Sequence, residues 1–263
     1  DDRKHFGNPD SILFWTAEQK VAGFRNQDLL APVRAVPRGS HVSILPNELQ
    51  ELGSTRFEHQ GMQLTINDYF RDFNTAGLLV IKDGVVRYER YGLGNTENTR
   101  WLSWSVAKSV TSMLVGAAIK DGYIKSVDEK VTDYLPRLKG SAYENVTIRN
   151  VLQMNSGVAW DETYSDSTAD INTVDWQTLA LYKRLGKKKR VAPPGTTFNY
   201  STAETNLVGN LLRAAIGNNL STYLSDKIWR PFGMEHDAYW QLVAIGDGEY
   251  GGSSLGATLR DYG

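Results

Sequence analysis

An apolar stretch with helical spacing begins directly after Trp104 and carries a serine and a lysine at its start. Its apolar positions recur every three or four residues: Val106, Ala107, Val110, Met113, Leu114, Ala117 and Ala118. This period predicts a helix that buries an apolar face in the core. Side chains three residues apart share a helix face, with Cβ atoms roughly 5–6 Å apart. Ser105 and Lys108 are therefore expected to meet at the beginning of a core helix.

Ser105 and Lys108 form an S-x-x-K pair, an arrangement suited to acyl transfer. If the helix begins near Trp104, the Ser105 N–H has no partner within the helix and can donate to an oxyanion on a substrate carbonyl. Lys108 is placed to take the proton of the serine hydroxyl. One S-x-x-K arises by chance in a chain of 263 residues, so the motif needs further support.

Composition narrows the classes of protein. With 263 residues and 41% hydrophobic content, the chain can bury a large core. A net charge of −1 gives no electrostatic case for nucleic acid or for an anionic membrane. The basic cluster between Lys183 and Arg190 precedes Pro193-Pro194-Gly195 and is interpreted as a solvated loop. No apolar run approaches the roughly 20 residues of a membrane span, so none is expected.

The chain has no cysteine, which excludes disulfides, thiolate metal sites and a cysteine nucleophile. Its four histidines, His5, His41, His59 and His236, lack the spacing of metal ligands, so no metal and no cofactor are expected. The lack of cysteine fits either redox compartment. Of the two, a periplasmic or secreted bacterial location is slightly favoured over a cytoplasmic one.

Turn and capping signals predict the remaining elements. Leu78–Ile81 and Val85–Tyr91, joined by Asp83-Gly84, predict a β-hairpin. Further helices are expected from Ser126 toward Leu135, from Thr147 to Met154, from Asp175 to Leu185 and from Thr202 to about Ile216. We therefore expect an N-terminal extension over residues 1–62, a sheet domain built from 63–103 and 236–263, and a mostly helical domain over 104–235.

Tyr200 lies just before the predicted Thr202 helix and behind a Pro-Pro-Gly turn. A tyrosine fixed at this edge can present its phenol to a cleft, although a core tyrosine with one hydrogen bond explains the pattern equally well. Ser201 and Glu204 form a capping-box signature, so Glu204 is assigned to the helix cap.

A second serine motif, Gly252-Ser253-Ser254-Leu255-Gly256, matches the G-x-S-x-G nucleophile elbow of α/β-hydrolases. That mechanism needs a histidine after the serine in chain order, and none follows Gly256 in this sequence. The glycines at 248, 251 and 252 also make a strand-turn-helix context poor, so this alternative is disfavoured.

Several motifs occur along the chain in a characteristic order and spacing: Phe14-Trp15, Ser105-Val106-Ala107-Lys108-Ser109, Asp121-Gly122-Tyr123-Ile124, Asp133-Tyr134-Leu135-Pro136, Met154-Asn155-Ser156-Gly157-Val158, Pro194 through Ser201, Ile228 through Met234 and Gly251 through Asp261. Together they resemble the motifs of the serine β-lactamase-related hydrolases. The similarity is greatest to 6-aminohexanoate-dimer hydrolases and related carboxylesterases, near class C β-lactamases. The resemblance implies an α/β (α+β) fold like that of β-lactamases and penicillin-binding proteins, with an antiparallel sheet flanked by helices and an all-helical region.

The same resemblance implies a mechanism and its residues. Ser105 would be the acylated nucleophile, Lys108 the base and Tyr200 a proton relay to the leaving group. Trp160 and Tyr164 stand where family members often place substrate-contacting aromatic residues, although their four-residue spacing also fits packing within a helix. The expected substrate is a small amide or ester, cleaved through an acyl-enzyme.

Two positions depart from the family pattern. Thr202 occupies the third position of the Tyr-x-Asn motif, a substrate-binding position. The asparagine amide that would bind a lactam carbonyl is therefore absent, and β-lactamase activity becomes a secondary expectation. The third family motif, Lys-Thr-Gly or His-x-Gly on a late strand, does not follow Tyr200. His59-Gln60-Gly61 matches the residues of this motif, but it lies before Ser105 and is therefore in the wrong place along the chain. We therefore expect the C-terminal part to be missing, so that a further segment or a second chain completes the fold.

Two alternatives from other classes remain open at this point. One is a non-catalytic binding protein of the penicillin-recognising type that keeps the shape of the acyl site. The other is a structural or regulatory domain, which a large separation between Tyr200 and Ser105 would favour.

Overall fold

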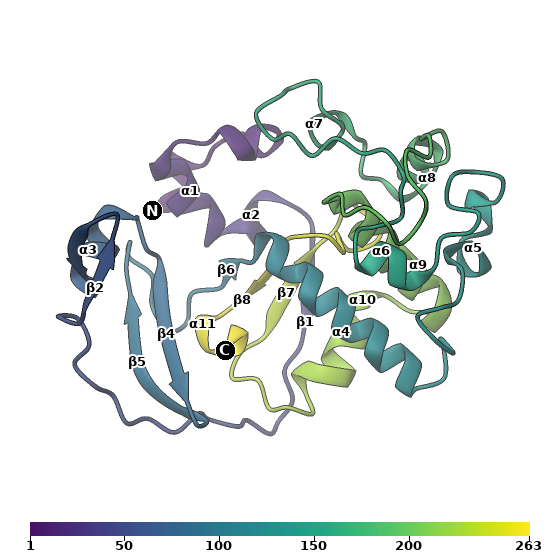
Figure 1. The fold of residues 1–263 in the computed structure, drawn as a ribbon. Helices are drawn as coiled ribbons and strands as arrows, with labels where there is room; N and C mark the ends of the chain where they lie inside the picture. The colour runs from purple at the N-terminus through teal and green to yellow at the C-terminus, as the bar shows by residue number, and fades with distance from the viewer.

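The computed structural model describes residues 1–263, apart from the side chain of Asp10. Figure 1 shows strands in the centre and at one end of the molecule, with most of the helices at the other end. The helices are α1 (Ala17–Phe24), α2 (Gln27–Leu30), α3 (Ile66–Asp72), α4 (Ala107–Lys120), α5 (Val131–Tyr134), α6 (Ile148–Leu152), α7 (Asp170–Thr173), α8 (Thr178–Leu185), α9 (Thr202–Ile216), α10 (Leu220–Leu224) and α11 (Leu259–Tyr262). Short 3₁₀ turns include η2 (Pro9–Phe14) and η3 (Trp104–Val106), the latter directly before α4.

The central sheet is antiparallel and has the strand order β1, β7, β8, β6. Its strands are β1 (Val33–Val36), β7 (Ala238–Gln241), β8 (Leu255–Ala257) and β6 (Trp101–Leu102). Strand β1 comes from the expected N-terminal extension, so this segment contributes an edge strand to the sheet. The domain boundaries themselves stay a prediction.

Two hairpins lie outside the central sheet. One pairs β2 (Arg56–His59) with β3 (Met62–Thr65), and the other pairs β4 (Gly77–Lys82) with β5 (Val85–Tyr91). Asp83 and Gly84 both have positive φ, 55° and 73°, as a tight two-residue hairpin turn requires. The hairpin predicted from the Asp-Gly turn is thus confirmed.

Helices α4 and α9 pack together and form much of the core. Every residue of α9 from Thr202 to Leu212 is buried, which is typical of a helix enclosed on all sides. Leu114 of α4 and Leu207 of α9 are both fully buried in this core. The helices predicted near 147–154, 175–185 and 202–216 are confirmed as α6, α8 and α9.

Other predictions for this region are wrong in detail. Val106 and Met113, expected in the core, are 56% and 51% exposed. The apolar residues of this stretch are spread over more than one side of the helix, so not all of them face the core. The helix expected from Ser126 begins only at Val131. The Ser126 hydroxyl accepts from the Asp128 N–H (2.9 Å) and not from the Glu129 N–H, as a capping box would require.

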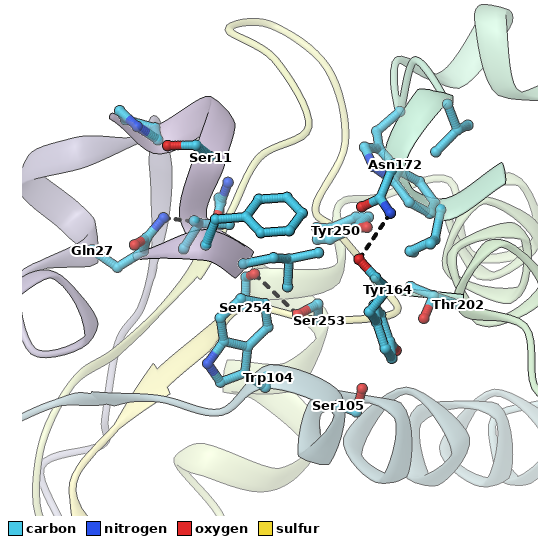
Figure 2. A pocket seen from close by; sticks show the side chains of 18 residues that line it. Ser11, Gln27, Trp104, Ser105, Tyr164, Asn172, Thr202, Tyr250, Ser253 and Ser254 are labelled. Atoms are coloured by element: carbon cyan, nitrogen blue, oxygen red, sulfur yellow. Dashed lines mark hydrogen bonds between the residues drawn. The ribbon is translucent and has the colours of Figure 1, made fainter. Parts of the chain in front are cut away.

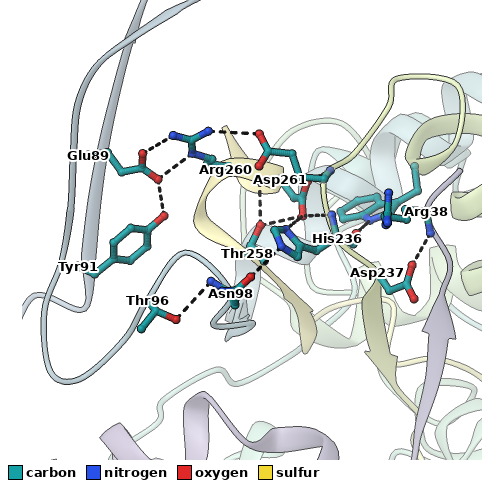
Figure 3. Close-up of polar contacts among 12 residues, drawn as sticks. Arg38, Glu89, Tyr91, Thr96, Asn98, His236, Asp237, Thr258, Arg260 and Asp261 are labelled. Carbon is teal, nitrogen blue, oxygen red and sulfur yellow. Dashed lines mark hydrogen bonds and ion pairs between the residues drawn. The ribbon is translucent and has the colours of Figure 1, made fainter. Parts of the chain in front are cut away.

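A buried ion pair fastens the last helix, α11, to strand β5 (Figure 3). The Arg260 guanidinium donates two hydrogen bonds to Glu89, from Nε (2.8 Å) and Nη2 (2.6 Å), and the side chains are only 14% and 10% exposed. Asp261 accepts from the Thr258 hydroxyl and from the backbone N–H groups of Glu235 and His236. This network joins α11 to the hairpin and to the segment leading into β7.

We predict that Glu89→Ala lowers the free energy of unfolding at pH 7 by about 3 kcal/mol, because it leaves a buried guanidinium without its main partner. Hydrogen bonding from Arg260 holds the pKa of Glu89 below its usual value of 4.5, so the stabilisation is complete above that pH and is lost as the pH falls further. Urea unfolding from pH 3 to pH 7 measures the difference. Arg71→Ala, which breaks an exposed pair with Asp68, is the control and should change little. Equal stability of Glu89→Ala and the unaltered protein would contradict the assignment.

Candidate active site

A pocket of about 410 Å³ opens at the start of α4 (Figure 2). Its walls come from η2, the segment 164–176, the first residue of α9 and the segment 250–254. Ser105 lies at its base with Trp104 beside it, and Tyr164, Thr202 and Tyr250 lie on the opposite side. Segments distant in the sequence therefore converge on the predicted nucleophile.

The predicted Ser105 and Lys108 pair is formed. Lys108 Nζ lies 2.9 Å from Ser105 Oγ and donates a second hydrogen bond, 2.7 Å long, to the carbonyl oxygen of Gly252. These two contacts fix the amine between the first turn of α4 and the segment that leads into β8. A serine hydroxyl within hydrogen-bond reach of a lysine amine is the geometry that proton removal from a nucleophile requires.

Close backbone packing brings Gly252 to Lys108. A Cβ atom on Gly252 would lie 2.8 Å from the carbonyl oxygen of Thr202, and one on Gly251 would lie 3.1 Å from the Cα of Gly209. Only glycines allow the chain to pass so near to α9. The disfavoured motif at 252–256 therefore has a structural explanation. Its last two residues, Leu255 and Gly256, belong to strand β8, and no helix follows Ser254 directly.

The backbone directly before the nucleophile is strained. Trp104 has φ of 46°, in the left-handed region that bulky residues rarely adopt. Its ring packs edge-on against Phe24, with centroids 5.4 Å apart. Two hydrogen bonds tie Ser103 to β8. The Ser103 N–H donates to the Leu255 carbonyl (2.7 Å), and the Ser103 hydroxyl accepts from the Leu255 N–H (3.0 Å). These contacts hold Ser105 at the base of the pocket.

Tyr200 lies beside this pair, as the sequence predicts. Its ring centroid is 5.1 Å from Lys108 Nζ, so the two are in cation–π contact. The preceding residue, Asn199, is anchored through its N–H to the Met154 carbonyl (2.8 Å) and through its amide to the Trp160 carbonyl (3.0 Å). Tyr200 thus contacts Lys108 of the Ser105 and Lys108 pair, and it is held in place just before the start of α9.

The three predicted substrate-binding residues occupy different positions. Tyr164 and Thr202 line the pocket. Trp160 is only 8% exposed and is not among the residues that line the pocket; its ring centroid lies 6.3 Å from that of Trp176. Trp160 and Tyr164 belong to no helix, so the explanation of their spacing by helix packing is wrong. Their roles toward a substrate stay a prediction.

One carboxylate of this wall was missed by the sequence analysis. Glu162 accepts hydrogen bonds from Trp160 Nε1, from the Tyr164 hydroxyl (2.9 Å) and from both the N–H (3.0 Å) and the hydroxyl of Thr202. The available signal was the alternation of Trp160, Glu162 and Tyr164, which places the three side chains on one side of an extended segment.

Glu204 does not complete the capping box assigned to it. Ser201 Oγ accepts from the Glu204 N–H (3.3 Å), but the carboxylate points into the core and accepts from the Ser156 and Tyr143 hydroxyls. Its second oxygen, Oε2, has no partner among the described side chains. Burial raises the pKa of Glu204 from 4.5 to about 7, although the two hydroxyls oppose that shift.

We predict that Glu204 makes the protein less stable as the pH rises from about 4.5 to about 7. Its pKa is higher in the folded than in the unfolded state, so its full contribution is present in acid and about 3 kcal/mol is lost across this window. Glu204→Gln, which keeps the acceptor for Ser156, should remove this part of the pH dependence and unfold at higher urea than the unaltered protein at pH 8. Parallel urea unfolding at pH 5 and pH 8 measures it, and an identical pH slope in the two proteins would refute the prediction.

Among the described residues, no group of His, Asp or Glu side chains is suited to hold a metal ion. In the same residues, no helix combines the length and the apolar character needed to cross a membrane.

Comparison with known proteins agrees with this fold. A Bacillus anthracis protein provisionally named a 6-aminohexanoate-dimer hydrolase superposes with a TM-score of 0.83 at 21% identity, over 92% of this chain and 66% of that protein. A class C β-lactamase superposes with a TM-score of 0.57 at 22% identity, over 74% of this chain and 60% of the enzyme. The fold is therefore of the β-lactamase and penicillin-binding-protein type, with antiparallel sheets and many helices.

Sequence comparison gives the family. The 6-aminohexanoate-dimer hydrolase of Paenarthrobacter ureafaciens is 28% identical over 197 residues, which are 71% of this chain and 50% of that enzyme. A β-lactamase of Pseudomonas fluorescens is 26% identical over 67% of this chain and 49% of the enzyme. The family model described as Beta-lactamase matches residues 58–258, so the chain belongs to the β-lactamase family, as a serine β-lactamase-related hydrolase. It spans about half the length of these two relatives.

Proposed function

We propose that the protein cleaves an amide or ester bond of a small substrate through an acyl-enzyme on Ser105. The observation that carries this proposal is the 2.9 Å contact between Lys108 Nζ and Ser105 Oγ at the base of a pocket. The similarity to a 6-aminohexanoate-dimer hydrolase supports a linear amide or an ester as substrate. A β-lactam ranks below these, because Thr202 stands where class C enzymes usually have asparagine.

The proposed reaction has two stages. Lys108 takes the proton of Ser105 Oγ as the oxygen attacks the substrate carbonyl, and the Ser105 N–H supplies one donor to the oxyanion. Tyr200, in contact with Lys108, relays a proton to the leaving group. Water then attacks the acyl-enzyme with the same groups acting in reverse, which releases the acid and restores Ser105.

The test uses p-nitrophenyl acetate with rapid mixing. The unaltered protein should release a burst of nitrophenol equal to the enzyme concentration. Ser105→Ala should lose kcat/KM by about 10³-fold or more, and Lys108→Ala by about 100-fold or more, because they remove the nucleophile and its base. Lys120→Ala, at the exposed far end of α4, is the matched control and should keep full activity.

An unchanged rate in Ser105→Ala would refute the proposal. A protein that shows no burst and gains no mass from a serine-reactive phosphonate would instead be a binding protein that retains only the shape of the site.

A further inference from the structure

Glu162 lies at the junction of two segments that form the pocket wall. Its Oε1 accepts from the hydroxyls of Tyr164 and Thr202, and its Oε2 accepts from the Thr202 N–H and from Trp160 Nε1. The donors thus come from the irregular segment that carries the aromatic residues and from the first residue of α9. One carboxylate connects the two.

The hydrogen-bonding capacity of this carboxylate is fully used. An ionised glutamate offers about four lone-pair sites, and four donors occupy them. Glu162 therefore has no free acceptor for a substrate or for a proton taken from Ser105. Because its charge strengthens each hydrogen bond, the group is suited to hold its neighbours in place.

The residues held by Glu162 are those that face the nucleophile. Tyr164 and Thr202 line the pocket together with Ser105 (Figure 2), whereas Glu162 is not among the residues that line it. The segment is also tied at its far end, where Asn172 donates to the Tyr164 carbonyl (3.1 Å). Near its start, the segment is also tied by the 3.0 Å hydrogen bond from Asn199, which precedes α9, to the Trp160 carbonyl. Glu162 is the contact that fixes the side chains of the wall.

We propose that Glu162 is a positioning residue for acyl transfer: it holds Tyr164 and Thr202 at a fixed place relative to Ser105, so that a bound acyl group is presented to the nucleophile. This inference rests on the function proposed above. It assigns Glu162 no contact with the substrate and no proton transfer.

Glu162→Gln can keep all four contacts, because its amide oxygen can accept from the Thr202 N–H and Trp160 Nε1 while its NH₂ group donates to the Tyr164 and Thr202 hydroxyls. The key variant is therefore Glu162→Ala, which removes the acceptor for all four donors, so the wall is no longer held in place. A displacement of about 1 Å can cost about 100-fold in rate, so kcat/KM for p-nitrophenyl butyrate should fall about 10- to 100-fold, with kcat reduced. Labelling of Ser105 by a small methylphosphonofluoridate needs only the Ser105 and Lys108 pair, and its rate should stay within about 3-fold.

Two controls separate positioning from a general loss of structure. Glu58→Ala, on an exposed strand remote from the pocket, is matched in chemistry and should leave both rates unchanged. Thr202→Val removes one of the four donors, and its effect on the ester should not add to that of Glu162→Ala, because both disturb the same contact.

The outcomes are distinguishable. Unchanged ester hydrolysis in Glu162→Ala, or equal losses for the ester and for the small phosphonate, would overturn the positioning role. Failure of the phosphonate to label Ser105 in the unaltered protein would instead remove the proposed function itself.

Discussion

The contact of Lys108 with both Ser105 Oγ and the Gly252 carbonyl is the interaction on which the rest of the site depends. Lys108 and Gly252 are 144 residues apart in the sequence, so the contact forms only once the core is assembled. It requires Gly251 and Gly252 to pass directly against α9. The same helix carries Thr202 and begins just after Tyr200. Packing of α9 therefore sets the position of every group proposed to take part in acyl transfer.

Strain at Trp104 is the cost of exposing the nucleophile. A bulky residue with positive φ costs on the order of 1–3 kcal/mol, which the surrounding structure must offset. The edge-on packing of Phe24 against Trp104 and the two hydrogen bonds between Ser103 and Leu255 of β8 provide that support. Because the N-terminal helix α1 supplies Phe24, this segment contributes to the site as well as to the sheet.

Local patterns in the sequence predict the elements and the central pair well. Spacing of three residues brings Ser105 to Lys108, and the Asp83-Gly84 turn fixes the hairpin, because in each case neighbours in the chain determine the geometry. Glu204 shows the limit of such reasoning: its spacing from Ser201 matches a cap, but burial against Ser156 decides where the carboxylate points. Glu162 was missed for a related reason: the alternation of Trp160, Glu162 and Tyr164 places these side chains on one side of the segment, but it does not indicate Thr202, the partner 40 residues away.

The most direct test of the central claim is to identify the residue that carries the acyl group. Ser11, Ser253 and Ser254 line the same pocket as Ser105, so the reaction with an activated ester offers the protein a choice of four serine hydroxyls. The measurement is peptide mapping by mass spectrometry after acid quenching during turnover. The account predicts the acyl mass on Ser105 alone. An acyl group on Ser11, Ser253 or Ser254, with Ser105 unmodified, would contradict it.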